Sequence, residues 1–161
     1  MSEFHAVLSP SSADRWMTCT ASVAATAEIP DTPSSFADEG TLAHELAANC
    51  LMKGHEPTDY IGKDITAPTS RGPIFGNVTR EMADYVEMYT DYIRDLVDSY
   101  QIQEANCHIE QRVYYDEFVA DGSGTADAVL IYERDGKNVL HVIDLKFGKG
   151  VEVSAFENKQ G

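Results

Sequence analysis

The clearest pattern along the chain is a helical one over residues 77–100. Apolar and aromatic side chains recur there at spacings of three and four, while acidic side chains occupy the other face. A period close to 3.6 residues with one polar face is typical of an amphipathic helix that covers a hydrophobic core. The predicted buried stripe consists of Met82, Val86, Tyr89, Ile93, Leu96 and Tyr100.

Two helices are predicted before this one. Ser9 followed by Pro10 is a favourable N-cap and first-turn pair, which predicts a helix over residues 10–27. After a short loop, Ser35 is expected to cap a second helix that ends near residue 54.

The period becomes extended after residue 100. Three strands are predicted, at Cys107–Tyr115, Gly124–Glu133 and Asn138–Phe147. Asp135-Gly136 is a strong signal for a hairpin turn, so the last two strands are expected to be antiparallel. Residues 55–76 mix Gly and Pro with polar residues and are predicted to form an irregular loop.

These elements predict an α/β fold that leans towards α+β, with the N-terminal helices packed on a small mixed sheet. A short extended piece is expected at residues 151–153, and residues 155–161 look like the first turn of a helix. A three-stranded sheet usually needs a layer on each apolar face, so either the helix over residues 77–100 covers it alone or the chain is C-terminally truncated, and we expect the truncation. The uncovered surface then favours self-association or a protein partner. The chain is read as a single domain, 1–161, made of N-terminal helices (1–54), a loop (55–76), an amphipathic helix (77–100), and a catalytic sheet with the start of a C-terminal helix (106–161).

The composition is that of a globular protein with a strong negative charge. Hydrophobic residues make up 43% of the 161 residues, so the chain can bury a core. The formal net charge is −15, with only 12 Lys and Arg. This balance argues against a conventional DNA-binding module, which neutralises phosphates with clustered basic residues. It does not exclude an enzyme that meets DNA through a metal ion, because a bound cation changes the local sign of the field.

The sequence shows no signal for membrane insertion or secretion and no cysteine motif for zinc. No apolar run is long enough to span a bilayer and no secretory signal begins the chain, so we expect no membrane association and a cytoplasmic location. The three cysteines, Cys19, Cys50 and Cys107, form no C-x-x-C pair, which argues against a cysteine zinc site. They are expected to be free thiols that behave as small buried hydrophobes.

The candidate chemistry lies on the last two predicted strands. Side chains alternate across a strand, so Asp144 and Lys146 are expected to share one face. Asp127 is the only charge in the apolar run of the preceding strand, and pairing across the hairpin can bring it near Asp144. Charges on apolar strands are costly to desolvate unless they are paired or bind a ligand.

Two carboxylates and a lysine suit the hydrolysis of phosphodiester bonds. Hard oxygen ligands hold Mg²⁺ or Mn²⁺, which lower the pKa of a bound water and offset charge on the phosphate. A lysine can orient or deprotonate that water and contact the phosphate. We expect the metal to be bound by Asp127, Asp144 and the main-chain carbonyl of Leu145.

Asp127 followed by Asp144-Leu145-Lys146 resembles the motif of the PD-(D/E)XK nuclease superfamily. Flanking residues make the chain similar to the RecB-like branch, which includes phage exonucleases and the CRISPR-adaptation exonucleases. Gly40-Thr-Leu-Ala-His44 resembles that branch's G-x-x-x-H helix, and the segment from Leu8 to Trp16 with Cys19 is similar to its opening helix.

The resemblance implies roles for further residues. His44 would join the metal site, Glu110 would supply an additional acid, and Gln160 would begin the Q-x-x-x-Y motif of a DNA-contacting helix. The Tyr of that motif is absent because the sequence ends at Gly161. The three further cysteines of the iron–sulfur relatives are also absent, so no iron–sulfur cluster is expected.

Structural alternatives remain open at each position. Asp144 and Lys146 also fit an ion pair on a solvated strand face, which would contribute little stability. Asp127 also fits a strand-end residue that bonds to the loop at residues 122–124. Glu110 also fits the exposed polar face of its strand, and a lone histidine such as His44 on an amphipathic helix is usually not a ligand.

Three functions follow from these readings. The first is a metal-dependent DNA nuclease, an exonuclease in phage-related DNA processing, in a bacterial or phage-infected cell. The second is a catalytically weak protein with the nuclease fold that acts by binding, such as an acidic phage inhibitor of a DNA-binding protein. The third is a plain scaffold domain. The Asp127, Asp144 and Lys146 set favours the first, and the charge of −15 favours the second.

Overall fold

The computed structural model of the chain describes residues 7–29 and 35–148. These residues divide into two compact units. The main unit comprises residues 35–111 and 126–148, and the N-terminal unit comprises residues 7–29 and 112–125. The division is not visible in the residue pattern, because it falls inside two strands rather than in a linker.

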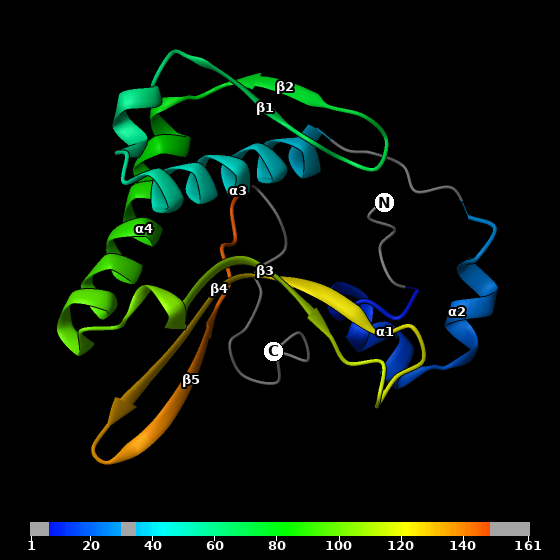
Figure 1. Cartoon of the computed structure of the whole chain (residues 1–161). Coiled ribbons are helices and arrows are strands. Elements are labelled where there is room, and N and C mark those ends of the chain that lie inside the picture. Colours follow the sequence, from blue (N-terminus) through cyan, green and yellow to red (C-terminus); the bar gives the residue numbers. More distant parts are fainter. Residues whose placement is uncertain (1–6, 30–34, 149–161) are drawn as a thin grey trace. The chain divides into compact units, whose positions relative to one another are not determined.

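Two long helices form the frame of the main unit, α3 (Ser35–Lys53) and α4 (Arg80–Tyr100), which pack against each other (Figure 1). The hydroxyl of Thr79 accepts a hydrogen bond from the Met82 N–H at 3.1 Å and so caps the first turn of α4. Gln101, with φ of 49°, adopts the left-handed conformation that ends it. Both helices confirm the prediction, because their apolar stripes and their terminal signals are local.

A small antiparallel hairpin packs on α3, formed by β1 (Asp64–Ala67) and β2 (Ile74–Asn77) after a short 3₁₀ helix, η2 (Pro57–Tyr60). The prediction of an irregular loop over residues 55–76 was therefore wrong. Each strand has only four residues, too few for a clear period. The packing is close: a Cβ added at Gly76 would lie 2.4 Å from the Leu42 side chain, so a larger residue there would require Leu42 to move.

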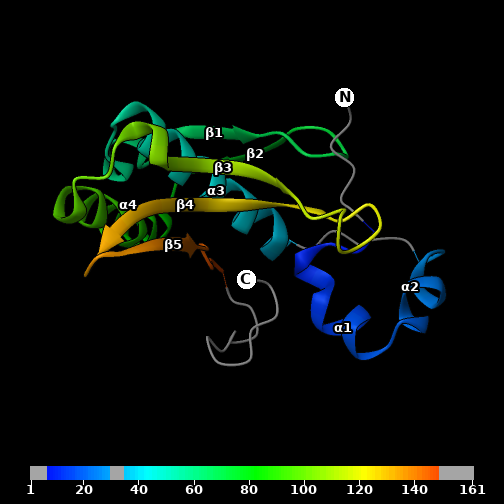
Figure 2. The ribbon, with the colours of Figure 1, turned by 60° about the horizontal axis from the view of Figure 1, so that its bottom comes forward.

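The second sheet has the order β3–β4–β5, with β3 (Cys107–Tyr114) following a short 3₁₀ helix, η3 (Glu104–Asn106). The other strands are β4 (Ser123–Arg134) and β5 (Lys137–Ile143), and the three lie side by side in Figure 2. Asp135 and Gly136 have φ of 53° and 72°, as a two-residue hairpin turn requires. The predicted antiparallel pairing is confirmed, with Ala128 opposite Ile143.

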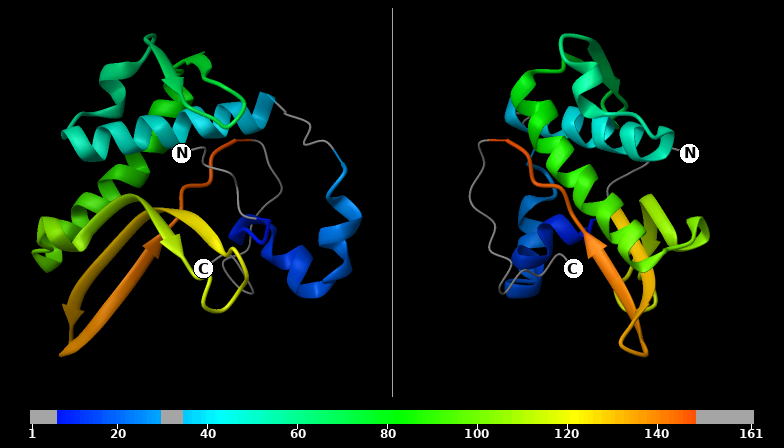
Figure 3. Two further views of the ribbon diagram at one scale, coloured as in Figure 1. Left: turned by 45° about the vertical axis from the view of Figure 1, so that its right-hand side comes forward. Right: turned by 90° about the vertical axis from the view of Figure 1, so that its left-hand side faces the viewer.

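Helix α4 joins the two cores of the main unit. Figure 3 shows it extending from the β1–β2 hairpin at one end to the three-stranded sheet at the other. Met82 and Val86 belong to the core with α3 and the hairpin, whereas Ile93 packs on Leu130 of β4. Tyr89 lies between and contacts both cores. The opposite face of the sheet is more open, with Leu140 67% and Val142 49% exposed.

Strand β5 ends four residues earlier than predicted. The strand stops at Ile143, and Leu145 turns into the core beside α3, where it is 6% exposed. Its N–H donates to Oδ2 of Asp127 at 2.7 Å instead of to a backbone carbonyl of β4. Asp144 and Lys146 therefore follow the strand, and the prediction that they share a strand face was wrong.

The described N-terminal unit contains η1 (Pro10–Ser12), α1 (Ala13–Thr18) and α2 (Ala21–Thr26). The single helix predicted over residues 10–27 was wrong, because Cys19 adopts an extended conformation with φ of −142°. Cys19 lies between two β-branched threonines, which are poor helix formers. Cys19 is also exposed, so its prediction as a buried hydrophobe was wrong, whereas Cys50 is buried as expected.

Side-chain hydrogen bonds to backbone carbonyls hold this unit together. The Tyr115 hydroxyl is 2.9 Å from the Leu8 carbonyl oxygen and 3.3 Å from that of Ser123. Trp16 donates its indole N–H to the Ser9 carbonyl at 3.0 Å. The predicted opening segment is thus tied to the start of β4, although its helix is interrupted.

The predicted mixed α/β class is confirmed, with two small antiparallel sheets and helices packed on them. Among the residues that the structure describes, no helix is both long and apolar enough to cross a membrane.

Candidate metal centre

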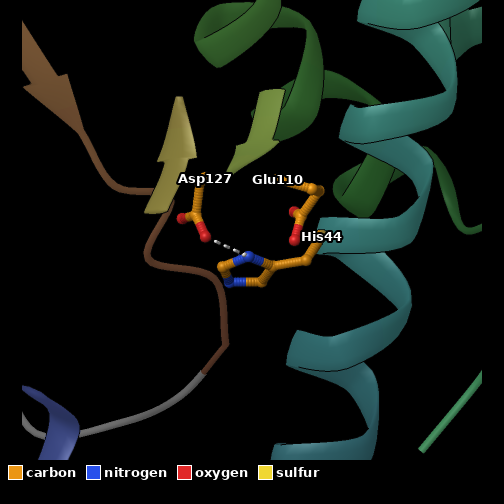
Figure 4. Close-up of side chains that lie close together, drawn as sticks. All are labelled: His44, Glu110 and Asp127. Carbon is orange, nitrogen blue, oxygen red and sulfur yellow. Dashed lines mark ion pairs between the residues drawn. The ribbon is translucent and has the colours of Figure 1, made fainter. Parts of the chain in front are cut away.

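A histidine and an aspartate from distant parts of the main unit meet at the centre of the candidate site. His44 lies in the middle of α3 and Asp127 lies on β4 (Figure 4). His44 Nδ1 is 3.2 Å from Asp127 Oδ1, and the two side chains are 31% and 12% exposed. A largely buried carboxylate needs such partners, because its desolvation is otherwise costly.

Both oxygens of Asp127 are used. One faces His44, and the other accepts the Leu145 N–H at 2.7 Å. This arrangement replaces the alternative in which Asp127 bonds to the loop at residues 122–124. Asp127 therefore links three segments: helix α3, strand β4 and the turn after β5.

Glu110 completes a three-residue cluster. One side-chain ligand atom from each of His44, Glu110 and Asp127 lies within 4.8 Å of the other two. Figure 4 shows the two carboxylates on either side of the imidazole. A ring nitrogen and two carboxylates at this spacing are suitable ligands for one divalent cation, with positions left for water.

The backbone of Glu110 is strained. Its φ is 52°, although it is a non-glycine residue inside β3. The left-handed conformation costs about 1–2 kcal/mol for a residue with a Cβ, so it persists only where the surrounding structure stabilises it. The conformation breaks the alternation of β3 and directs the carboxylate to His44 and Asp127. The alternative, an exposed position on a polar strand face, is right about exposure, because Glu110 is exposed, but it does not account for the left-handed backbone.

The pKa of His44 depends on two opposing effects, burial and nearby negative charge. Burial lowers its pKa, but the hydrogen bond to Asp127 and the charges of Asp127, Glu110 and Asp144 act in the opposite direction. The net effect raises the pKa above the ordinary value of 6.5. A cation at the cluster would take the place of this proton, since imidazole binds metals in its neutral form.

We expect the raised pKa of His44 to make the stability of the metal-free chain depend on pH. A protonated His44 paired with Asp127 stabilises the fold fully below the unfolded pKa of about 6.5. This contribution is lost as the pH rises through the higher folded value. Imidazole titration by NMR and urea unfolding between about pH 5 and 9, both in chelator, measure it. The dependence should vanish in His44→Gln and persist in His108→Gln; equal curves for the two variants would contradict the assignment.

A narrow space, too small to hold a water molecule, lies beside the cluster. Its lining includes Ala47 and Leu51 of α3, Tyr89 of α4, and the three cluster residues. The Tyr89 hydroxyl is buried and, within the described residues, has no hydrogen-bond partner. Burial, and then the charges of Asp127, Glu110 and Asp144, raise the pKa of Tyr89 well above its ordinary value, so the phenol remains protonated.

Asp144 and Lys146 lie next to this cluster rather than in it. Their side chains form an ion pair with each other, and each is 50% exposed. The exposed-pair alternative therefore describes their geometry, although not on a strand. Asp144 contributes charge at His44, and the segment that follows runs along α3, where a Cβ added at Gly40 would be 3.5 Å from the Phe147 carbonyl oxygen.

Of the remaining predicted site residues, the structure describes Leu145 but not Gln160. The Leu145 N–H takes part in the site through Asp127, while metal binding by its carbonyl stays a prediction. Gln160, the predicted DNA contact, and the predicted elements after residue 150 lie outside the described residues.

Sequence reasoning assigned Tyr89 to core packing and missed its position beside the cluster. A signal was present, because a tyrosine in an apolar helical stripe needs a partner for its hydroxyl. The strained φ of Glu110 left no signal in the sequence, since glutamate has no preference for that conformation.

The fold and the site together define a mixed α/β protein with a histidine–carboxylate cluster between a helix and a sheet. The chain belongs to the DUF2800 family, described as a protein of unknown function, whose model matches residues 5–160. No solved structure matches the chain.

Proposed function

We propose that this protein is a metal-dependent DNA nuclease that hydrolyses phosphodiester bonds with Mg²⁺ or Mn²⁺, and that it acts as an exonuclease. The observation that supports this proposal most is the cluster of His44, Glu110 and Asp127. These residues come from α3, β3 and β4, and Glu110 has a left-handed backbone with φ of 52°. The resemblance to RecB-like nucleases shares these three residues, rests also on Asp144 and Lys146, and points to the same chemistry.

The cluster fits the requirements of a divalent cation. A bound Mg²⁺ or Mn²⁺ would supply Lewis acidity, lowering the pKa of a water and offsetting charge on the phosphate. The two carboxylates provide hard oxygen ligands, and His44 adds a nitrogen that Mn²⁺ accepts more readily than Mg²⁺. Asp127 keeps its orientation because the Leu145 N–H holds its second oxygen.

Lys146 supplies the mobile positive charge in this proposal. It lies two residues after Asp144 and is half exposed, so its ammonium group can reach a phosphate that enters from solvent. The exposed pair with Asp144 contributes about 0–1 kcal/mol, so Lys146 can leave Asp144 for a phosphate at little cost in free energy. In the new position Lys146 would bind the phosphate and orient or deprotonate the attacking water.

Cation binding and DNA cleavage by the whole chain test the proposal. We expect calorimetric titration to show one Mn²⁺ site, which Glu110→Gln weakens and Asp95→Asn, an exposed change on α4, leaves intact. We expect cleavage of linear DNA that stops in chelator, whereas closed circular DNA should survive if the enzyme is an exonuclease. A folded chain that neither binds Mn²⁺ nor cuts any of these substrates would refute the nuclease.

A second function, binding of a basic partner without catalysis, is favoured by one observation. The net charge is −15, and α4 exposes a row of acids to solvent: Glu81, Asp84, Asp91, Asp95 and Asp98. Such a surface complements the DNA-binding face of another protein. Inhibition of such a protein by a chain that lacks nuclease activity would support this function and contradict the first.

A further inference from the structure

The hydroxyl of Tyr89 occupies an unusual position in the main unit. Its ring packs between the two cores, where phenylalanine would fill the same space. The hydroxyl itself is buried and has no hydrogen-bond partner in the described part of the chain. A buried polar group without a partner is destabilising, so the hydroxyl is unfavourable for packing alone.

The surroundings of this hydroxyl point to a ligand-dependent role. Tyr89 lines the same narrow space as His44, Glu110 and Asp127. A phenol is both a donor and an acceptor, and beside carboxylates its useful function is to donate. Groups that donate to metal-binding carboxylates orient them and adjust their affinity for the ion.

We propose that Tyr89 is a positioning residue of the metal centre, which donates its O–H to a carboxylate of the cluster when a cation binds. The inference rests on the proposed cation site and adds a residue from α4 to it. Tyr89 would thereby connect the occupancy of the centre with both cores of the main unit. It would not contact the substrate or take part in bond breaking.

The test compares Tyr89→Phe with Tyr85→Phe in the whole chain. Both changes remove one phenolic oxygen from α4, but Tyr85 is 54% exposed and its ring lies against Phe147. In chelator, the melting temperature of Tyr89→Phe should equal or exceed that of the wild type, because an unsatisfied group is removed. Its Mn²⁺ affinity should fall about 10- to 100-fold, as for other groups that support metal ligands. Tyr85→Phe should change neither quantity.

Other outcomes separate the inference from the proposed function. If the wild type binds Mn²⁺ and Tyr89→Phe binds it equally well, the inference is wrong and the metal centre stands. If the wild type binds no Mn²⁺, both are wrong. Mn²⁺ should also produce a tyrosine ultraviolet difference spectrum in the wild type that is lost in Tyr89→Phe, and a spectrum unchanged by this substitution would contradict the role.

Discussion

Replacing Asp127 with asparagine is expected to abolish Mn²⁺ binding and to lower DNA cleavage by about 10²- to 10³-fold or more. A divalent cation at this site would contribute several kcal/mol to the stabilisation of the transition state, and each 1.4 kcal/mol corresponds to about tenfold in rate. Asp127 is the residue that contacts both His44 and the Leu145 N–H. Loss of its charge would remove a proposed ligand and also weaken the contact with His44.

A comparison with alanine separates the chemical effect from the structural one. The asparagine amide oxygen can still accept the Leu145 N–H, so Asp127→Asn should stay folded. Asp127→Ala leaves that buried N–H without its partner and should lose about 1–3 kcal/mol of unfolding free energy. Urea unfolding measures this difference, while calorimetry and cleavage assays measure the site.

The matched control is Asp135→Asn in the β4–β5 turn. Asp135 is 89% exposed at its side chain and has φ of 53°, a conformation that asparagine tolerates well. The change removes one negative charge from the same hairpin without touching the cluster. Equal Mn²⁺ binding by Asp127→Asn and Asp135→Asn would show that Asp127 holds no cation.

Replacing Lys146 with alanine is expected to lower cleavage about 10²-fold or more while leaving the fold and Mn²⁺ binding largely unchanged. A group that orients the attacking water or transfers its proton contributes on this scale. The stability should change by less than about 1 kcal/mol, because the side chain is half exposed and its ion pair with Asp144 is solvated.

Two further variants define what Lys146 does. Lys146→Arg keeps the charge but does not give up a proton near neutral pH, so partial recovery would indicate that charge on the phosphate matters most. Lys137→Ala removes an exposed lysine from β5 and serves as the control. Wild-type cleavage rates in a folded Lys146→Ala would rule out the assigned role.

Local sequence patterns were sufficient where an element is decided by its own residues. The stripe of α4 predicted its buried face, and Asp135-Gly136 predicted the β4–β5 turn and its antiparallel pairing. Asp127 was identifiable because a single charge within an apolar strand is costly without a partner. His44 and Glu110 were selected only through the family resemblance, since neither has a local signal of its own.

Other features depend on contacts between residues far apart in the chain. The β1–β2 hairpin is too short to show a period, and it exists because Ile65 and Ala67 pack on α3. Strand β5 ends at Ile143 because the Asp127 carboxylate takes the Leu145 N–H and Leu145 enters the core. A hydrogen bond across 18 residues leaves no trace in the local pattern.

The arrangement of the site also depends on contacts between residues far apart in the chain. Asp144 and Lys146 have the spacing of strand neighbours, yet they pair with each other in solvent after the strand has ended. Glu110 reaches the cluster through a φ of 52° that its own residue type disfavours, and Tyr89 reaches it because α4 spans both cores. Propensity and periodicity describe free energies that are local along the chain. The positions of these groups are determined by packing between elements, which can outweigh the cost of local strain and of a buried hydroxyl.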